Sequence, residues 1–300
     1  MNGFDDARLD QARRAIAALG NGLTAELLDA TTAIYAPLHD AERPGDVRIT
    51  RDISYGPHER HRLDIFQPVG AGGRRTAIVF VHGGGFVGGD KSKPGSPFFD
   101  NIGDWSVRHG FAGVNMTYRL APGAPWPAGA DDVAAAADWL AGQAGALGID
   151  RLLLLGQSAG AAHVAMALAL HEERLKTAGV CGAVLLSGVY DLTIANPKAV
   201  SAAYYGADPA LFAERSSQAR LLACRIPWLV AVAEHDPGHF QRQALGLIEA
   251  AFAAHGRLPP LLQLLGHNHL SGILHLGLPR DQLGPAVAEF AAAAAGAPAA

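Results

Sequence analysis

The chain has 300 residues, of which 49% are apolar and only 17% are charged. This composition excludes a disordered chain, which needs low hydrophobicity and high charge, and the length allows one α/β domain with a sizeable core. The net charge of −4 and the lack of a dense basic run argue against nucleic acid as a partner. Glycine is frequent, with 36 residues, so the positions of the glycines carry information.

Compartment and membrane signals are weak in this sequence. The two cysteines, Cys181 and Cys224, lie in apolar stretches and lack the CxxC spacing of a metal or redox site. The N-terminus lacks the apolar segment of a secretory signal, and no stretch reaches the ~18 consecutive apolar residues of a membrane span. We therefore expect a cytoplasmic protein with two reduced thiols.

The N-terminal region reads as a pair of helices. Apolar residues recur near a 3.6-residue period from Ala7 to Leu19, and Asn21-Gly22 ends this helix. Thr24 is suited to cap a second helix that continues through Tyr35. Residues 1–47 are therefore expected to form a helical segment of their own.

From residue 48 onward, strand and helix patterns alternate. Predicted strands cover 49–55, 62–67, 76–82, 111–120, 151–156, 181–190, 227–235 and 259–267. Predicted helices cover 131–145, 158–173, 241–256 and 285–295. Apolar strands separated by helices predict an α/β fold with a mostly parallel central sheet flanked by helices. Residues 191–222 carry no clean strand and are expected to pass over the edge of the sheet.

The strongest local pattern is Gly156-Gln157-Ser158-Ala159-Gly160, which fits G-x-S-x-G. A predicted buried strand precedes it and a long predicted helix follows it. In that context the serine lies at a tight strand-to-helix turn, where its hydroxyl is held clear of the sheet. Ser158 is therefore the candidate nucleophile, the alternative being a serine that only caps the helix.

A second glycine cluster, His82-Gly83-Gly84-Gly85-Phe86, directly follows a predicted strand. Successive glycines after a strand can turn their N–H groups toward one point, as the oxyanion of an acyl-transfer reaction requires. The alternatives are a flexible loop or a phosphate cradle. The chain has neither the G-x-G-x-x-G nor the Walker lysine pattern, which weakens the phosphate interpretation.

A serine nucleophile needs a histidine base. His267 and His269 both follow the last predicted strand, and His275 comes shortly after. A histidine just past the carboxyl end of a strand can reach over the sheet to the serine. The residues alone leave the choice among them open.

The base in turn needs an orienting carboxylate. Asp236 ends the preceding strand and gives the chain order serine, acid, histidine that is typical of the α/β-hydrolase arrangement. Asp191, one strand earlier, and Glu234 are the competing acids.

These motifs together resemble the α/β-hydrolase superfamily, and within it the hormone-sensitive-lipase-like esterases. The resemblance runs from about residue 48 to the end and is carried by HGGGFVGGD (82–90), YRLAPGAPWP (118–127), GQSAG (156–160), EHDP (234–237) and a late histidine. It implies a catalytic domain over 48–300 behind a helical cap segment at 1–47, with 191–222 as a further cap excursion. It also implies the site residues Ser158, Asp236 and His269, with Gly84, Gly85 and Ala159 as the oxyanion donors and His82 in a structural role.

The resemblance implies hydrolysis of carboxylic esters through an acyl-enzyme, with no metal or organic cofactor. One departure is Gly123, where the family's YRLAPE has glutamate, so a buried ion pair near that loop is expected to be missing. LSGVYDL (186–192), EHDPGHFQRQ (234–243) and HNHLS (267–271) are closer to the kynurenine-formamidase-like hydrolases, which cleave an N-formyl aryl amide. An arylformamidase is therefore the alternative activity, and a non-catalytic ligand receptor of the same fold is a third.

The expected partner is a small ester or formamide substrate. Several aromatic residues are candidates for its pocket, and core packing is the alternative role of each: Tyr35, Phe86, Trp126, Tyr204 and Tyr205. The oligomeric state does not follow from the sequence, and a homodimer paired through an edge strand is compatible with this fold.

Overall fold

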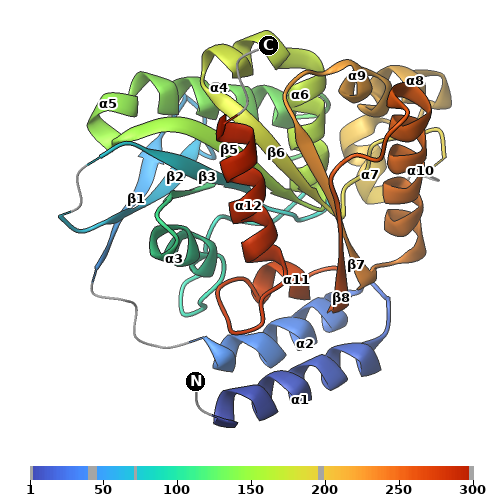
Figure 1. The fold of residues 1–300 in the computed structure, drawn as a ribbon. Coiled ribbons are helices and arrows are strands. Elements are labelled where there is room, and N and C mark those ends of the chain that lie inside the picture. The colour runs from blue at the N-terminus through green and yellow to red at the C-terminus, as the bar shows by residue number, and fades with distance from the viewer. Residues whose placement is uncertain (1–2, 40–45, 71–72, 195–198, 297–300) are drawn as a thin grey trace.

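The computed structural model describes residues 3–39, 46–70, 73–194 and 199–296. Its centre is an eight-stranded sheet in the order β1-β2-β4-β3-β5-β6-β7-β8 (Figure 1). The strands are β1 (Val47–Ser54), β2 (Arg62–Pro68), β3 (Arg75–Val81), β4 (Ala112–Met116), β5 (Ile149–Gln157), β6 (Val180–Leu186), β7 (Trp228–His235) and β8 (Leu261–Asn268). β1, β2 and β4 pair antiparallel, and every pair from β4 to β8 is parallel. The predicted mostly parallel sheet is confirmed.

Helices cover both faces of this sheet. They are α1 (Gly3–Leu19), α2 (Ala25–Tyr35), η1 (Ala36–Leu38), α3 (Asp100–Arg108), α4 (Ala128–Gly142), α5 (Ala144–Leu147), α6 (Ala159–Thr177), α7 (Ala199–Tyr205), η2 (Pro209–Leu211), α8 (Phe212–Arg215), α9 (Gln218–Ala223), α10 (Gly238–His255), α11 (Ser271–Leu274) and α12 (Leu283–Gly296). Thr24 caps α2 by accepting a hydrogen bond from the Leu27 N–H, as the sequence predicts. Among the described residues, no helix is both long and apolar enough to cross a membrane.

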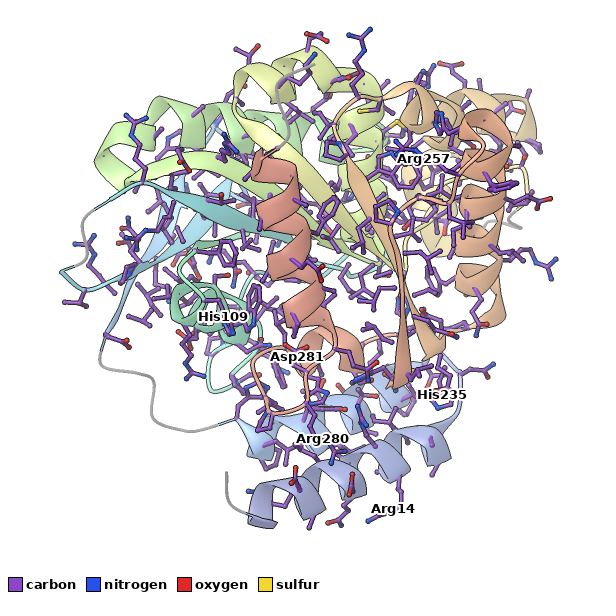
Figure 2. All side chains as sticks on the ribbon, viewed as in Figure 1. Arg14, His109, His235, Arg257, Arg280 and Asp281 are labelled. Atoms are coloured by element: carbon purple, nitrogen blue, oxygen red, sulfur yellow. The ribbon has the colours of Figure 1, made fainter. Side chains whose placement is uncertain are left out.

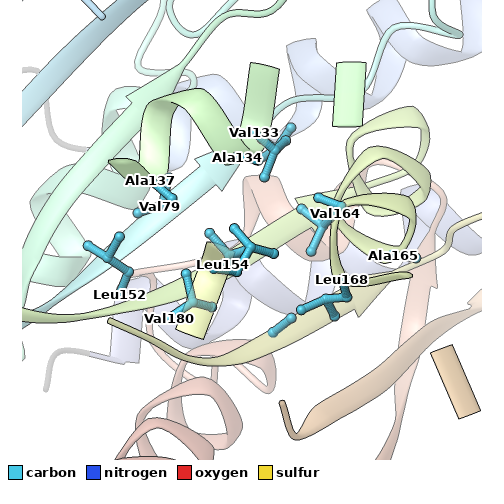
Figure 3. Close-up of a cluster of buried hydrophobic side chains, with 14 of the residues drawn as sticks. Val79, Val133, Ala134, Ala137, Leu152, Leu154, Val164, Ala165, Leu168 and Val180 are labelled. Carbon is cyan, nitrogen blue, oxygen red and sulfur yellow. The ribbon is translucent and has the colours of Figure 1, made fainter. Parts of the chain in front are cut away.

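Alternate side chains of each central strand enter two different cores, as the two-residue repeat of a strand requires. Val79 and Leu154 face the core that α4, α6 and α10 cover, and Figure 3 shows part of this cluster. Phe80 and Leu155 face the opposite core, which contains residues of α1, α2, α3 and α12. Burial on both faces explains why these strands read as continuous apolar runs.

The N-terminal helices pack near the carboxyl end of β8 (Figure 1). Arg280, in the loop before α12, points toward α1 (Figure 2) and its guanidinium lies 2.6 Å from the carboxylate of Asp10. Buried contacts of Ile16 and Tyr35 with the second core add to this attachment. Residues 3–39 therefore belong to the same packed body as the sheet.

The structure differs from the sequence predictions at several strand ends and in short helices that were not predicted, among them α3, α7, α9 and α11. The strand predicted over 111–120 ends at Met116, because the Arg119 N–H donates to the Asp132 carboxylate instead of to a neighbouring strand. The strand predicted over 181–190 ends at Leu186, since Ser187 takes a left-handed φ of 54°. α3 has only nine residues and was not predicted.

Candidate active site

Ser158 lies between the end of β5 and the start of α6, with φ 55° and ψ −118°. Residues other than glycine rarely adopt a positive φ, and the strain it stores is typical of functional turns. The turn has room for glycine alone on each side. A Cβ at Gly160 would lie 2.0 Å from the carbonyl oxygen of Val81, and one at Gly156 would lie 2.6 Å from the Cα of Ala161. The spacing of G-x-S-x-G thus follows from close backbone contact on both sides of the serine.

The structure brings Ser158, His269 and Asp236 together in one hydrogen-bonded line. His269 Nε2 lies 2.8 Å from Ser158 Oγ, and His269 Nδ1 lies 2.6 Å from Asp236 Oδ1. His269 is 4% exposed and Asp236 is fully buried. A hydroxyl, an imidazole and a buried carboxylate in this order allow the histidine to take the serine proton while the acid orients the ring.

The second oxygen of Asp236 has two further donors. Its Oδ2 accepts from the Ala233 N–H at 2.7 Å and from the Ser187 hydroxyl at 2.6 Å. These bonds satisfy the buried carboxyl and fix its plane, so that Oδ1 points at the imidazole. Since Oδ1 accepts from Nδ1–H, Nε2 is left to accept the proton of Ser158.

The competing acids are occupied elsewhere. Asp191 Oδ1 accepts from the backbone and hydroxyl of Thr193, at 2.8 and 2.6 Å. Glu234 Oε2 accepts from the Gly266 N–H at 2.7 Å. Neither carboxylate is bonded to His269, so the geometry selects Asp236 from the three acids that the sequence leaves open.

The competing histidines form a separate buried pair. His267 Nδ1 lies 3.0 Å from Ser271 Oγ, and His275 Nδ1 lies 3.3 Å from His267 Nε2. Tyr35 packs against both rings. Burial lowers the pKa of His267 to about 3 and that of His275 to about 4, so both are neutral at physiological pH. Tyr35, a candidate pocket residue, thus lies in this cluster.

The glycine loop, residues 82–91, lies directly against the nucleophile turn. A Cβ at Gly83 would lie 3.2 Å from the Cβ of Ser158 and 2.3 Å from Gln157 Oε1. Gly84 and Gly85 have φ values of 130° and 62°, which turn the backbone sharply here. Within the described ranges, the N–H groups of Gly84, Gly85 and Ala159 have no hydrogen-bond acceptor, so they are available to an anion.

His82 and Phe86 border this loop. His82 Nδ1 lies 2.6 Å from the Gly83 carbonyl oxygen, and its ring stacks on Tyr118. Full burial lowers the pKa of His82 to about 4, which makes it a neutral packing residue rather than a second base. Phe86 stacks on Tyr204 with ring centroids 4.8 Å apart and planes within 5°.

The predicted excursion over 191–222 contributes to the same region. Its described part forms α7, η2, α8 and α9, while residues 195–198 lie outside the described residues. Tyr204 and Tyr205 form a buried apolar cluster with Phe86, and that cluster reaches Ala159 beside the serine. Trp126 packs at its edge with the Arg215 guanidinium over its ring.

Gly123 has open space beside it, with only the Leu120 carbonyl oxygen within 4 Å of a hypothetical Cβ. Residues other than a glutamate at position 123 form an ion pair near this loop. Arg119 Nη2 lies 2.7 Å from the buried carboxylate of Asp132, and His61 Nε2 lies 3.1 Å from the same oxygen. An ion pair between buried Asp132 and partly exposed Arg119 therefore lies beside this loop without the glutamate.

Sequence reasoning missed three side chains that touch the hydrogen-bonded line. Ser187 donates to Asp236, Gln157 Nε2 donates to the His269 carbonyl at 2.9 Å, and Phe240 stacks on the His269 ring. All three residues lie within motifs quoted above. Their closeness in the sequence to the candidate site residues was the signal that could have identified them. No group of three or more histidine, cysteine, aspartate or glutamate side chains in the described ranges is arranged to hold a metal ion.

Part of the chain is similar in sequence to a known family and to known esterases. The BD-FAE family model matches residues 63–195. The chain is 35% identical over 113 residues to an ethyl acetate hydrolase of Pseudomonas putida, covering 37% of this chain and 33% of that protein. It is 30% identical over 131 residues to a probable isoprenylcysteine alpha-carbonyl methylesterase of Arabidopsis thaliana, covering 43% of this chain and 29% of that protein. The chain thus spans about a third of the length of these relatives.

Solved structures match the whole fold. Esterase B of Lactobacillus rhamnosis superimposes with a TM-score of 0.70 at 19% identity, covering 96% of this chain and 97% of that one. A thermostable esterase of Pseudomonas putida superimposes with a TM-score of 0.65 at 21% identity, covering 95% of this chain and 94% of that one. Together with the sheet order, these matches show that the chain has the α/β-hydrolase fold.

Proposed function

We propose that this chain is a serine hydrolase that cleaves carboxylic esters through an acyl-enzyme. The observation that carries the proposal is the hydrogen-bonded line Ser158–His269–Asp236 at a strained turn, facing a glycine loop with unpartnered N–H groups. The similarity to an ethyl acetate hydrolase and to a methylesterase supports an ester as the substrate.

In the proposed mechanism, His269 Nε2 takes the proton of Ser158 as Oγ attacks the ester carbonyl carbon. Asp236 holds the imidazole in the required tautomer and stabilises the imidazolium that forms. The N–H groups of Gly84, Gly85 and Ala159 stabilise the tetrahedral oxyanion, and each such donor contributes about 10²–10³-fold to the rate. His269 then donates its proton to the leaving alcohol, and water hydrolyses the acyl-enzyme by the same steps.

The proposal extends to the segments around the site. We assign residues 48–300 as the catalytic domain and the helices of residues 1–47 as a cover beside the histidine. The hydrogen bond of 2.8 Å from Asn268 Nδ2 to Thr31 Oγ1, one residue from His269, supports this position for α2. The packing of Tyr204 and Tyr205 on Phe86 supports a second cover from the excursion of 191–222.

The test measures kcat/KM on p-nitrophenyl esters of increasing acyl length and on N-formylkynurenine. Ester turnover is expected in the wild type, and Ser158→Ala should lower it by at least ~10⁴-fold. Ser54→Ala, at an exposed serine of β1, is the matched control and should leave turnover unchanged. Retained activity in Ser158→Ala, or no ester turnover in the wild type, would refute the proposal. A formamide preference of several hundredfold would instead favour the arylformamidase.

A further inference from the structure

Phe240 lies on the first turn of α10, four residues after Asp236, and its ring stacks on the ring of His269. The two ring centroids are 4.1 Å apart and the planes are inclined by 24°. Phe240 is 6% exposed, so the contact is shielded from solvent. In the sequence, Phe240 is only one residue of the motif EHDPGHFQRQ (234–243). No step of the proposed mechanism uses Phe240.

The hydrogen bonds of His269 leave one motion of its ring unrestrained. Both bonds, to Asp236 Oδ1 and to Ser158 Oγ, lie at ring nitrogens and therefore in the plane of the ring. Rotation about the line through these two nitrogens tilts the ring while it changes neither distance. A flat contact on one face opposes that tilt, and Phe240 supplies it.

The same contact also faces the charge that His269 gains during the reaction. During attack by Ser158 the imidazole becomes an imidazolium, and the face of an aromatic ring attracts a cation. The attraction to the neutral imidazole is weaker. Phe240 therefore stabilises the transition state more than the resting state, and an interaction of that kind raises kcat.

The turn that carries Phe240 is itself fixed. Gln241 Nε2 donates to the Asp236 carbonyl oxygen at 2.8 Å. Gln243 Oε1 accepts from the N–H groups of Tyr190 and Asp191 at 2.8 and 2.9 Å, and its Nε2 donates to the Asp191 carbonyl at 2.6 Å. These bonds join the first two turns of α10 to the segments that follow β6 and β7, so Phe240 rests on a fixed support.

We propose that Phe240 is a positioning residue that acts through His269, by fixing the tilt of the imidazole and by favouring its protonated form in the transition state. This inference rests on the proposed function, in which His269 is the base. It assigns a role to the first turn of α10 beyond the three residues of the hydrogen-bonded line.

The test compares Phe240→Leu, which removes the ring face, with Phe240→Tyr, which keeps it. On a p-nitrophenyl ester, Phe240→Leu should lower kcat by roughly three- to thirtyfold with KM within twofold of wild type. Phe240→Tyr should keep kcat within threefold. Phe252→Leu, at a phenylalanine of the same helix that is 54% exposed, is the matched control and should match wild type. Denaturant unfolding of each variant shows that the assays use folded protein.

If Phe240→Leu does not fold, Phe240→Met gives the same reading, because methionine fills the volume of the ring without its face. Wild-type kcat in the aliphatic variants, or a rise in KM with unchanged kcat, would overturn the role of Phe240. Failure of the proposed function has a different signature, since the wild type itself would then lack ester turnover.

Discussion

The two loops that flank Ser158 are held by opposite kinds of interaction. The glycine loop ends in a buried charge: Lys91 is 5% exposed, and its ammonium lies 2.7 Å from Asp52 and 3.0 Å from Asp64. Arg51 reaches the same Asp64 carboxylate at 2.7 Å. Burial alone would lower the pKa of Lys91, but its bonds to these carboxylates outweigh burial and raise that pKa.

The histidine loop, residues 267–275, is held by neutral groups. His275 Nε2 lies 3.0 Å from the Pro279 carbonyl oxygen, which can only accept, so this nitrogen carries the proton. His275 Nδ1 then accepts from His267, and His267 Nδ1 accepts from the Ser271 hydroxyl. The Lys91 end of the glycine loop therefore depends on charges that stay paired, and the histidine loop depends on two histidines that stay uncharged. Substitution and acid should separate the two.

The largest effect is expected from Lys91→Met, which leaves buried Asp64 without one of its cations. Breaking a buried ion pair by removing one partner typically destabilises a protein by about 3–5 kcal/mol. Urea unfolding at pH 7 measures the loss. Lys176→Met removes a lysine whose partner, Glu173, is exposed, and should cost less than about 1 kcal/mol. Equal losses in the two variants would contradict the ionic anchor of the glycine loop.

Acid should act on the buried neutral histidines, two of which lie in the histidine loop and one of which, His82, begins the glycine loop. The folded pKa values of His267 and His275 lie at about 3 and 4, below the ordinary value of 6.5. Below pH 6.5 these two histidines bind protons in the unfolded chain but not in the folded chain. The free energy of unfolding therefore falls as the pH drops toward 4. At pH 5 each histidine should contribute a loss of about 2 kcal/mol.

The measurement for this prediction is urea unfolding at pH 7 and at pH 5. His275→Gln removes one of the two groups, so the loss between these pH values should shrink by about 2 kcal/mol. His255→Gln, at the exposed end of α10, should leave the wild-type loss unchanged. An unchanged pH dependence in His275→Gln would show that His275 does not contribute to the loss of stability in acid.

A smaller effect is expected where α2 meets the histidine loop. Thr31 Oγ1 accepts from Asn268 Nδ2 at 2.8 Å and is fully buried. Thr31→Val keeps the shape but leaves a buried amide donor unpaired, which costs about 1–3 kcal/mol. Thr32→Val is the matched control, since the Thr32 hydroxyl donates only to the carbonyl of Leu28 in its own helix. A similar loss in both, measured by thermal unfolding, would count against a specific tie between α2 and the loop.

Much of the fold could be predicted because the sheet is buried on both faces. Strands such as β3 and β5 therefore contain unbroken apolar runs, at residues 77–81 and 152–155, and G-x-S-x-G stands out where one of them meets a helix. α3 escaped prediction because it has only nine residues and follows a glycine- and proline-containing stretch, so too few turns exist for a periodic pattern.

The sequence predicted which residue types form the candidate site, but the residues alone did not decide which acid and which histidine take part. Asp191 and Asp236 follow β6 and β7, while Glu234 lies within β7, next to its last residue, and the surroundings of each residue decide where its carboxylate points. Asp236 is turned by the Ala233 N–H and by Ser187, a residue one strand away. The contact of Phe240 with His269 likewise depends on the direction of α10, which no local pattern encodes.

The smallest effect is expected at Gln157, a residue that contacts both the histidine loop and the glycine loop. Its Nε2 donates to the His269 carbonyl, while its Oε1 lies against Gly83 of the glycine loop. Gln157→Met removes a single hydrogen bond and should cost about 1 kcal/mol of stability. Because that bond fixes the main chain of His269, kcat for an ester should fall several-fold while KM stays constant, and Gln263→Met at an exposed position of β8 should change neither. If kcat were unchanged in Gln157→Met, the histidine loop would hold His269 without help from the nucleophile turn, and the two loops would be independent.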